Sequence, residues 1–559
     1  MIPENGIRSE IDMPPWEHEP ITAESDYVVV GSGSAGAIVA RRLADSGASV
    51  TLIESGRQLR GPLVNVPGMC GAIHAATALQ RMVTWPARTV PQRHMNGRRL
   101  PQSHGRALGG GSVVNGMAFV RGNRRNYDDW AESGATGWGF DDVLPAFRRL
   151  ESFEDGASEL RGGDGPIAVE RATGLAPVTH EFMSALSATT GVPFNDDYNG
   201  AEQRGVAALQ QSIGAGRRYG TDRGYLWDAP ANLRVISGVT ASRVVVENGR
   251  ATGVELVRGR GGKPAGIARA GREVIVSAGS LGSPRVLMLS GIGHANHLHE
   301  HGIDVVADLP VGDNLHDHLF VPISFHAPSG RRASPVHFGA ALAREMVRPQ
   351  STYLAHTLFE AVAFVDSGVR GGPIPDLQMF ILPLGYPENQ DEPGLHLAED
   401  TSPSLSLLPT MIYPESRGTV RLSSADPLAA PLINPNYLAE SPDLATLVAG
   451  LELVRDIIGH KDIRGSVGTE VFPGVGCTGP ELAEFARRNA SGVYHPVGTC
   501  RAGTDERAVV DPQLRVRGID GLRVADASIM PSIVGGNTNA AAMMIGERAA
   551  ELILAGVPA

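Results

Sequence analysis

The sequence is short of several residue types, and each shortage excludes a class of protein. Its three cysteines, Cys70, Cys477 and Cys500, are too few and too scattered for a disulfide framework or a four-cysteine zinc site. No stretch approaches the roughly 18 uninterrupted apolar residues of a membrane-spanning helix. Residues 1–24 carry charges and prolines where a secretory leader needs an apolar core. We therefore expect a soluble, cytoplasmic protein without a membrane span.

Positive charge is also in deficit. The 49 Lys plus Arg against 60 Asp plus Glu give a net charge of -11. Since attraction to phosphate dominates nucleic-acid affinity, we expect no nucleic-acid partner. A composition with 42% hydrophobic and 19% charged residues is that of a globular protein. At about 150 residues per domain, 559 residues correspond to three to four domain-equivalents, which we interpret as two large, interleaved domains.

The first informative segment is an apolar, β-prone run that leads into glycines. It begins at Asp26 and reaches Gly31, Gly33 and Gly36, and residues 37–46 then have helical composition. In a dinucleotide-binding unit the first glycine permits a tight turn. The second lets backbone N–H groups approach a pyrophosphate, and the third lets the helix pack closely on the strand.

A second strand and an acidic residue complete this unit. Residues 48–53 have the pattern of a buried strand, and Glu54 follows them, 18 residues after Gly36. About 20 residues are expected before the acid that binds the ribose hydroxyls. A carboxylate at this place disfavours a 2′-phosphate and hence NADP. The unit alone leaves NAD and FAD open.

Two further segments have the pattern of cofactor loops. Residues 105–118 contain three consecutive glycines followed by Ser112 and Asn115, which suits backbone lying against a flat or charged cofactor. The apolar residues 274–276 predict a strand, and Ser283 with Pro284 predicts a helix start. This pattern predicts a second crossover beside the first.

The C-terminal part combines a histidine with a possible helix cap. His495 precedes a proline in a constrained turn, and a short strand from residue 521 ends at Asp526. Asn537 then stands where a cap would begin an alanine-rich helix that runs to Leu554. Taken alone, such a histidine is an ordinary satisfied polar residue and such an asparagine an ordinary cap.

Together the four segments resemble the glucose–methanol–choline family of FAD-dependent oxidoreductases, from about Asp26 to the end. Residues 105–122 and 279–293 resemble its two signature segments. The resemblance implies an α/β fold, with a Rossmann-type FAD-binding domain interleaved with an α+β substrate-binding domain whose antiparallel sheet is flanked by helices. The expected boundaries are an N-terminal extension at 1–24, an FAD-binding domain at 25–160, 205–315 and 505–559, and a substrate-binding domain at 161–204 and 316–504.

The resemblance also implies the residues that bind FAD. The glycine turn would face the pyrophosphate, Ala241 the adenine, and the loop after residue 105 and the C-terminal segment the flavin. The implied residues are Gly31, Gly33, Ser34, Ala35, Gly36, Glu54, Arg106, Gly111, Ser112, Asn115, Gly116, Met117, Ala118, Ala241, Asp526, Ala527, Asn537 and Thr538. Val114 stands where some choline-oxidising members carry a histidine that tethers FAD. We therefore expect non-covalent FAD, and no metal.

The family oxidises primary or secondary alcohols by transferring the carbinol hydride to flavin N5. His495 matches its general base, and Asn537 matches the partner that orients the alcohol oxygen. The expected partners are a small-molecule alcohol and O₂ or another electron acceptor. Val493 favours oxygen access but leaves oxidase and dehydrogenase open. The oligomeric state is not predicted.

Residues 328–366 are expected to cover the active-site entrance. Their arginines, Arg331, Arg332, Arg344 and Arg348, leave an acidic substrate open. Choline is disfavoured because no acidic and aromatic cage is evident and aromatics are only 5% of the chain, so a neutral primary alcohol is the default.

Three other functions stay open. A lyase or light-driven decarboxylase can use the same flavin fold, and so can a non-enzymatic flavin-binding protein. The histidines His294, His297, His301, His316 and His318 leave a divalent-metal site as the third alternative.

Overall fold

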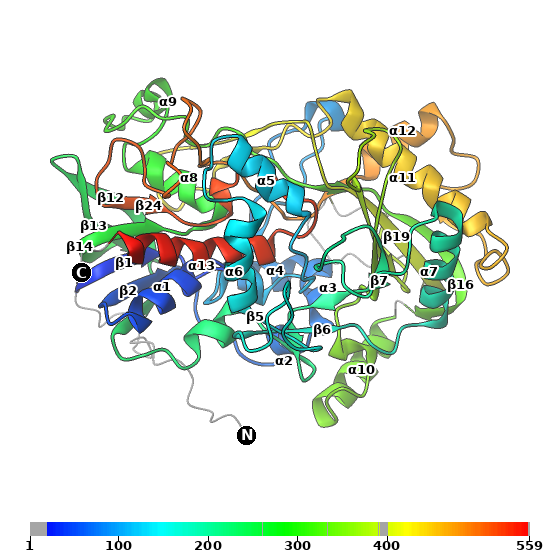
Figure 1. The fold of residues 1–559 in the computed structure, drawn as a ribbon. Coiled ribbons are helices and arrows are strands. Elements are labelled where there is room, and N and C mark those ends of the chain that lie inside the picture. The colour runs from blue at the N-terminus through cyan, green and yellow to red at the C-terminus, as the bar shows by residue number, and fades with distance from the viewer. Residues whose placement is uncertain (1–19, 260, 333, 389–390, 392–400, 557–559) are drawn as a thin grey trace.

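The computed structural model of the protein describes residues 20–259, 261–332, 334–388, 391 and 401–556. Two large sheets lie beside each other, and helices cover their outer faces (Figure 1). The first sheet is mainly parallel and the second is antiparallel. This arrangement confirms the expected α/β class with two interleaved units.

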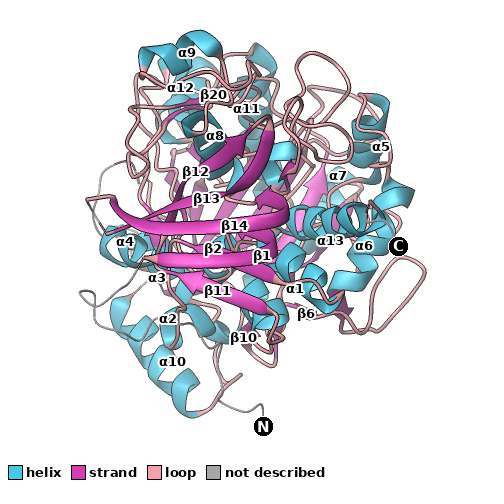
Figure 2. Ribbon diagram, turned by 90° about the vertical axis from the view of Figure 1, so that its left-hand side faces the viewer, coloured by secondary structure: helices cyan, strands magenta, loops and turns pink. Residues whose placement is uncertain are grey.

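The first sheet has seven strands. Their order is β11 (Leu233–Ser237), β2 (Val50–Glu54), β1 (Ile21–Val30), β14 (Lys263–Val276), β13 (Arg250–Arg258) and β12 (Thr240–Glu247), with β24 (Leu522–Val524) paired to the end of β14. β12, β13 and β14 form an antiparallel meander, and the other pairs are parallel. Figure 2 shows this sheet from β12 to β11, with α13 (Asn539–Ala555) and α6 (Phe140–Leu150) beside it. Ligands of open parallel sheets bind at the carboxyl ends of the strands.

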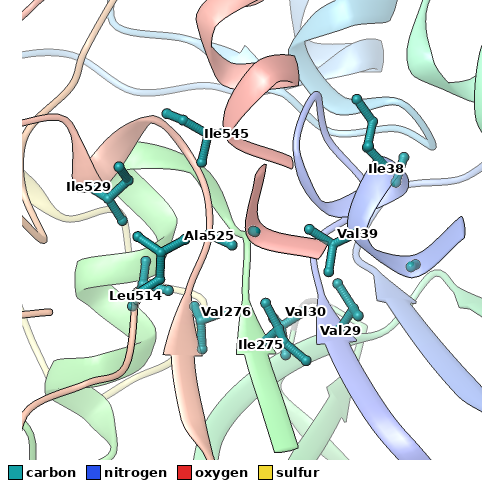
Figure 3. Close-up of a cluster of buried hydrophobic side chains, with 14 of the residues drawn as sticks. Val29, Val30, Ile38, Val39, Ile275, Val276, Leu514, Ala525, Ile529 and Ile545 are labelled. Carbon is teal, nitrogen blue, oxygen red and sulfur yellow. The ribbon is translucent and has the colours of Figure 1, made fainter. Parts of the chain in front are cut away.

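The expected strand, turn and helix unit is confirmed. β1 leads into α1 (Gly36–Asp45), and β2 follows. Val29 and Val30 of β1 pack with Val39 of α1 in the first core, which also receives Ile545 of α13 (Asn539–Ala555) (Figure 3). The predicted extension lies outside the described residues as far as residue 19. β1 already begins at Ile21, because residues 21–25 continue its pairing with β14.

The second crossover differs from its prediction at the helix start. α8 (Gly279–Leu289) begins four residues before the predicted start at Ser283, so Pro284 lies inside the helix. A proline there has no N–H to donate to the Ser280 carbonyl one turn earlier. Thr499 Oγ1 donates to that carbonyl instead, at 2.7 Å. A hydroxyl from a distant segment therefore makes the internal proline tolerable.

The second sheet has eight strands. Their order is β22 (Glu470–Phe472), β16 (Ile323–Arg332), β19 (Pro403–Met411), β18 (Leu377–Leu382), β17 (Ala361–Val365) and β7 (Gly205–Ala208), with β15 (Leu319–Phe320) paired to β19 and β23 (Ser491–Gly492). Leu377, Met379 and Ile381 of β18 pack in a core with α7 (Pro177–Thr190) and α11 (Ser441–Gly459). Since strand side chains alternate between faces, Gln378, Phe380 and Leu382 point to the opposite face.

One predicted domain boundary disagrees with this pairing. Residues 205–208 were expected in the FAD-binding domain, but they form β7 and pair with β17 of the second sheet. Val206 is buried in the core beneath α7 and α11, and Ala207 in the cluster on the opposite face. Burial on both faces fixes the segment there. The boundary predicted at residue 25 also moves, because β1 begins at Ile21, and the remaining boundaries stay a prediction.

The remaining elements connect or cover the two sheets. The helices are α2 (Pro62–Asn65), α3 (Met69–Ala75), α4 (Thr77–Val83), α5 (Arg124–Glu132), α6 (Phe140–Leu150), α9 (Ala295–Glu300), α10 (Pro335–Val347) and α12 (Pro480–Asn489). The short strands are β3 (Thr84–Trp85), β4 (His104–Gly105), β5 (Glu151–Phe153), β6 (Ile167–Arg171), β8 (Gln210–Gln211), β9 (Ile213–Gly214), β10 (Arg217–Arg218), β20 (Thr419–Arg421) and β21 (Leu432–Asn434). Within the described ranges, no helix combines the length and apolar character needed to cross a membrane.

Candidate active site

A cavity of about 730 Å³ lies where the two sheets meet. From the first sheet it is lined by residues at the carboxyl ends of β1, β2 and β14, among them Val30, Ile53 and Ser277. From the second sheet it is lined by Phe380 and Leu408. The volume is in the usual range of small-molecule and cofactor sites, and its position is the one expected for an open parallel sheet.

The glycine turn after β1 forms one end of the cavity. Gly31 has φ +96°, and a Cβ atom there would lie 2.4 Å from the Ser277 carbonyl oxygen. A Cβ at Gly36 would lie 2.0 Å from the Gly31 carbonyl oxygen, so Gly36 serves packing and does not itself line the cavity. Gly33 is open on its cavity side and lines it with Ser34 and Ala35. The backbone N–H groups at the start of α1 are therefore accessible from the cavity, and such groups favour binding of an anionic phosphate.

Glu54 lines the cavity at the end of β2 and also holds the turn. Its Oε2 accepts from Ser32 N at 3.1 Å and Ser32 Oγ at 2.8 Å, and its Oε1 accepts from Gly56 N at 2.7 Å. Burial raises the pKa of this carboxyl, and the backbone donors oppose the rise. Each carboxylate oxygen has further acceptor capacity, so Glu54 can also accept from ribose hydroxyls.

The triple-glycine loop packs directly against the first turn. A Cβ at Gly110 would lie 2.6 Å from Gly33 Cα, so only glycine fits where the two segments meet. Gly111 and residues 115–118 line the cavity. Arg218 donates to Asn115 Oδ1 at 2.7 Å, and Met117 has φ +59°.

Two residues expected along the flavin lie elsewhere. Ser112 Oγ donates to the Gly109 carbonyl at 2.6 Å and accepts from Thr221 N at 3.0 Å, so it holds the loop from behind. Arg106 is exposed, and its guanidinium lies over the Trp85 ring, 4.4 Å from the centroid. Neither side chain lines the cavity, because the loop turns both of them away from it.

Ala241, Asp526, Ala527 and Thr538 line the cavity. The Asp526 carboxylate, buried and with a raised pKa, accepts from Gly279 N at 2.9 Å and Ser283 Oγ at 2.5 Å. It therefore joins the end of β24 to the start of α8.

Several buried polar atoms among the cavity-lining residues that the structure describes have no partner. Ser280 Oγ, His104 Nδ1 and Arg285 Nε are buried without a hydrogen-bond partner, and their residues line the cavity. Buried polar atoms are normally satisfied, so such a set points to a polar ligand. These atoms and the open glycine turn fit a dinucleotide such as FAD.

His495 is fixed by a chain of hydrogen bonds. His318 Nε2 lies 3.0 Å from the Ile412 carbonyl oxygen, which can only accept, so this nitrogen carries the proton. His318 Nδ1 therefore accepts from His495 Nδ1, 3.0 Å away. Burial lowers the pKa of His318 well below its usual value and that of His495 to about 3, so both rings are neutral. His495 Nε2 therefore carries the lone pair of the ring, and this lone pair faces the cavity as an acceptor.

Asn537 faces this lone pair. Its Nδ2 lies 3.2 Å from His495 Nε2, and its Oδ1 accepts from Gln378 Nε2 at 3.0 Å. The prediction that Asn537 caps the last helix is wrong. α13 begins at Asn539 without a side-chain cap, because the Asn537 amide is engaged by Gln378 and His495. Both His495 and Asn537 line the cavity.

A buried carboxyl anchors the backbone of His495. Asp317 Oδ1 accepts from His495 N at 2.7 Å, and Asp317 Oδ2 accepts from Gln102 Nε2 at 2.7 Å and Tyr437 Oη at 2.5 Å. Burial raises the Asp317 pKa to about 6. The preceding Tyr494 has φ +60°, a conformation that costs a bulky residue energy and persists at functional sites.

Sequence reasoning missed the roles of His318, Gln378 and Asp317. Residues 314–318 carried the available signal, since Asp317 and His318 lie in one short polar run next to a strand. Gln378 gave no signal, because it is a single polar residue in the otherwise apolar β18.

The other histidines that left a metal site open lie apart from the cavity. His294 pairs with Asp313 at 2.9 Å, and His297 Nε2 accepts from Leu422 N at 3.0 Å. His316 is buried. Among the residues that the structure describes, no group of three or more His, Cys, Asp or Glu side chains is arranged to hold a metal ion.

The segment expected at the entrance does reach the cavity. Pro335 and Phe338 of α10 line it, and so do Leu358 and Phe359 further along. Of the four arginines, Arg332 lines the cavity, while Arg331 is paired with Glu360 at 2.6 Å. Arg344 and Arg348 are exposed and do not line it.

Comparison with known proteins agrees with the family resemblance of the sequence. Two family models, both described as GMC oxidoreductase, match residues 25–320 and residues 414–546. An oxygen-dependent choline dehydrogenase of Rhizobium etli is 39% identical over 545 residues, which cover 96% of each chain. A protein of the same name from Brucella suis is 39% identical over 552 residues, again 96% of each chain.

Solved structures of similar fold include two oxidases. Pyridoxine 4-oxidase from Mesorbium loti matches with a TM-score of 0.84 and 27% identity, covering 95% of this chain and 100% of that one. A formate oxidase of Aspergillus oryzae matches with a TM-score of 0.85 and 26% identity, covering 96% of this chain and 98% of that one.

Proposed function

Because the chain belongs to the GMC oxidoreductase family, we propose that it oxidises a primary or secondary alcohol to the carbonyl compound, with His495 as the general base. The protein is an FAD-dependent oxidoreductase acting on CH–OH donors. The observation that carries the proposed mechanism is the neutral His495, whose Nε2 lone pair faces the Asn537 amide inside the cavity.

The chain supplies the proton acceptor and the oxygen-orienting group. His495 Nε2 takes the hydroxyl proton, because its Nδ1 proton is committed to His318. Asn537 Nδ2 donates to the alcohol oxygen and keeps it within reach of the imidazole, while Gln378 prevents the amide from flipping. When bound, FAD would supply the acceptor for the hydride that leaves the carbinol carbon as the C=O bond forms. O₂ or another acceptor must then take up the two electrons.

We infer which residues hold FAD from where they lie. Gly33, Ser34 and Ala35 would bind the pyrophosphate at the start of α1, and Glu54 the adenosine ribose. Val114 lines the cavity and cannot form a covalent bond to a flavin, so FAD would be bound non-covalently. Acid precipitation should then release all flavin into the supernatant. Flavin retained in the pellet would contradict this.

The proposed reaction is tested by anaerobic flavin reduction. The purified yellow holoenzyme is mixed with a panel of alcohols, and the loss of flavin absorbance is followed. His495→Ala should slow reduction by about 10²-fold or more, because general-base catalysis contributes 10²–10⁴-fold. An unchanged rate in this variant, at equal FAD content, would remove His495 from the role.

The same experiment separates the open alternatives. Reoxidation in air on the catalytic timescale makes the protein an oxidase, and slow reoxidation makes it a dehydrogenase. If no alcohol reduces the flavin, the lyase or decarboxylase alternative takes precedence. Choline enters the panel because two similar proteins carry its name.

A further inference from the structure

Apolar side chains enclose the cavity next to His495. Val493 packs in one cluster with Phe320, Phe380 and Leu408, which lie on the cavity side of the second sheet. The rings of Phe359 and Phe380 are 5.0 Å apart between centroids, and those of Phe320 and Tyr386 are 5.9 Å apart. More aromatic side chains therefore meet here than the composition led us to expect.

The opposite wall is mostly apolar and carries no carboxylate among its described residues, although Gln80 of α4 also lines it. Ile73 of α3, Leu79 of α4 and Ala76 between the two helices line it, and α10 contributes Phe338. His74 lies among them, and burial lowers its pKa to about 4, so the ring is neutral at physiological pH. We call the space between this wall and the second sheet the apolar chamber.

Carboxylates are confined to the other end of the cavity. Among the lining residues that the structure describes, the only carboxyl side chains are Glu54 and Asp526. Both lie at the first sheet, where backbone N–H groups and serine hydroxyls occupy them. The charged side chain on the second-sheet side is Arg332, at the end of β16.

We propose that the apolar chamber accepts an uncharged alcohol whose non-reacting part is a branched aliphatic or aromatic group, and that it rejects alcohols carrying a permanent positive charge. This inference rests on the proposed function. A quaternary ammonium in the chamber would lose its hydration without gaining a carboxylate, and Arg332, which is exposed at the end of β16, offers it no attraction. The aromatic faces offset only part of that cost.

A pair of alcohols of nearly equal shape tests the charge. Choline and 3,3-dimethyl-1-butanol differ by the replacement of a quaternary nitrogen with carbon. In anaerobic rapid mixing with the holoenzyme, the neutral alcohol should reduce the flavin with a second-order rate constant about 10²-fold higher, which corresponds to about 2.7 kcal/mol. Benzyl alcohol should also be a substrate. Equal rates, or a preference for choline, would overturn the inference.

A variant pair tests whether the missing carboxylate is the cause. Leu384 lines the chamber and is only half-buried, so it can accommodate a polar replacement. Leu384→Glu should raise the rate with choline relative to the neutral alcohol by about tenfold, since a charge pair at an effective dielectric constant near 20 contributes a few kcal/mol before desolvation. Leu384→Gln has nearly the same shape without the charge and should leave the ratio unchanged. If both variants shift the ratio equally, charge is not the determinant.

Failure of this inference is distinguishable from failure of the proposed function. A flavin reduced by choline in preference to neutral alcohols refutes the substrate class but supports alcohol oxidation. If no alcohol in the panel reduces the flavin, the proposed function itself is refuted.

Discussion

The Nδ1 atoms of His318 and His495 lie 3.0 Å apart, and this contact decides which nitrogen of His495 is free to act as a base. Because the Ile412 carbonyl fixes the proton on the far side of His318, the near side can only accept. The Ile412 carbonyl therefore determines, through the ring of His318, that Nε2 of His495 carries the lone pair.

His318→Phe should remove the acceptor that holds the Nδ1 proton of His495. The imidazole can then place its proton on Nε2, and the rate of flavin reduction should fall by 10-fold to about 10²-fold, in line with other residues that orient a catalytic histidine. Stopped-flow reduction measures the loss. His318→Gln restores an acceptor and should recover part of the rate. Equal rates in both variants would show that only ring packing matters.

Gln378→Leu should release the Asn537 amide. Without the bond to Asn537 Oδ1, the amide can flip and present its oxygen to His495. We expect KM to rise and kcat to fall, so that kcat/KM decreases by about tenfold. This is the effect of losing about one hydrogen bond. Met379→Leu, on the opposite face of β18, is the matched control and should leave both constants unchanged. A Gln378→Leu enzyme with normal constants would mean that Asn537 is held by other contacts.

The free energy of unfolding should fall as the pH drops from 6.5 to about 4. Burial lowers the pKa of His74 and His104 to about 4 and that of His495 to about 3, each from 6.5. In that window the unfolded chain binds protons that the folded chain does not, so acid favours unfolding. Above pH 6.5 these histidines contribute no pH dependence. Denaturant unfolding at several pH values measures the slope.

Asp317 acts in the opposite direction. Its pKa is raised to about 6 from 3.8, so its contribution is largest below pH 3.8 and is lost as the pH rises through 6. The pKa values of Glu54 and Asp526 are also raised by burial, but the buried histidines with a lowered pKa, which include His316 and His318, outnumber these carboxyls. His495→Asn should make the pH dependence shallower, and an unchanged slope would mean that His495 titrates normally in the folded protein.

Gly36→Ala should abolish tight FAD binding and destabilise the fold by about 1–3 kcal/mol, the usual cost of forcing a methyl group into packed backbone. The added Cβ would lie 2.0 Å from the Gly31 carbonyl oxygen. Gly459→Ala, at the end of α11, meets nothing within 4 Å and is the control. It should be neutral or stabilising by up to about 1 kcal/mol. The FAD content of each purified variant measures cofactor binding, and the denaturant midpoint of each variant measures its stability.

Local patterns predicted the first crossover well. The strand, glycine turn, helix and second strand from Ile21 to Glu54 depend on neighbours in sequence, and α1 and β2 lie within two residues of their predicted positions. The fold class and the family followed from four such segments in order.

Contacts between distant segments explain what the sequence did not reveal. His318 touches His495 across 177 positions, and Gln378 touches Asn537 across 159 positions. Asn537 had the pattern of a helix cap because only its local context was visible. Pro284 indicated a helix start because Thr499, which compensates it, is 215 positions further along in sequence.

The place of β24 also bears on how the protein is made. β24 pairs with β14 inside the first sheet, and His495 and Asn537 lie on either side of it in the chain. While a ribosome is still adding residues before position 490, the nascent chain has its glycine turn but neither catalytic residue nor the last parallel strand. We therefore expect the cofactor to be enclosed late in biosynthesis, because residues 274–276 of β14 have no partner on this side until β24 has been made.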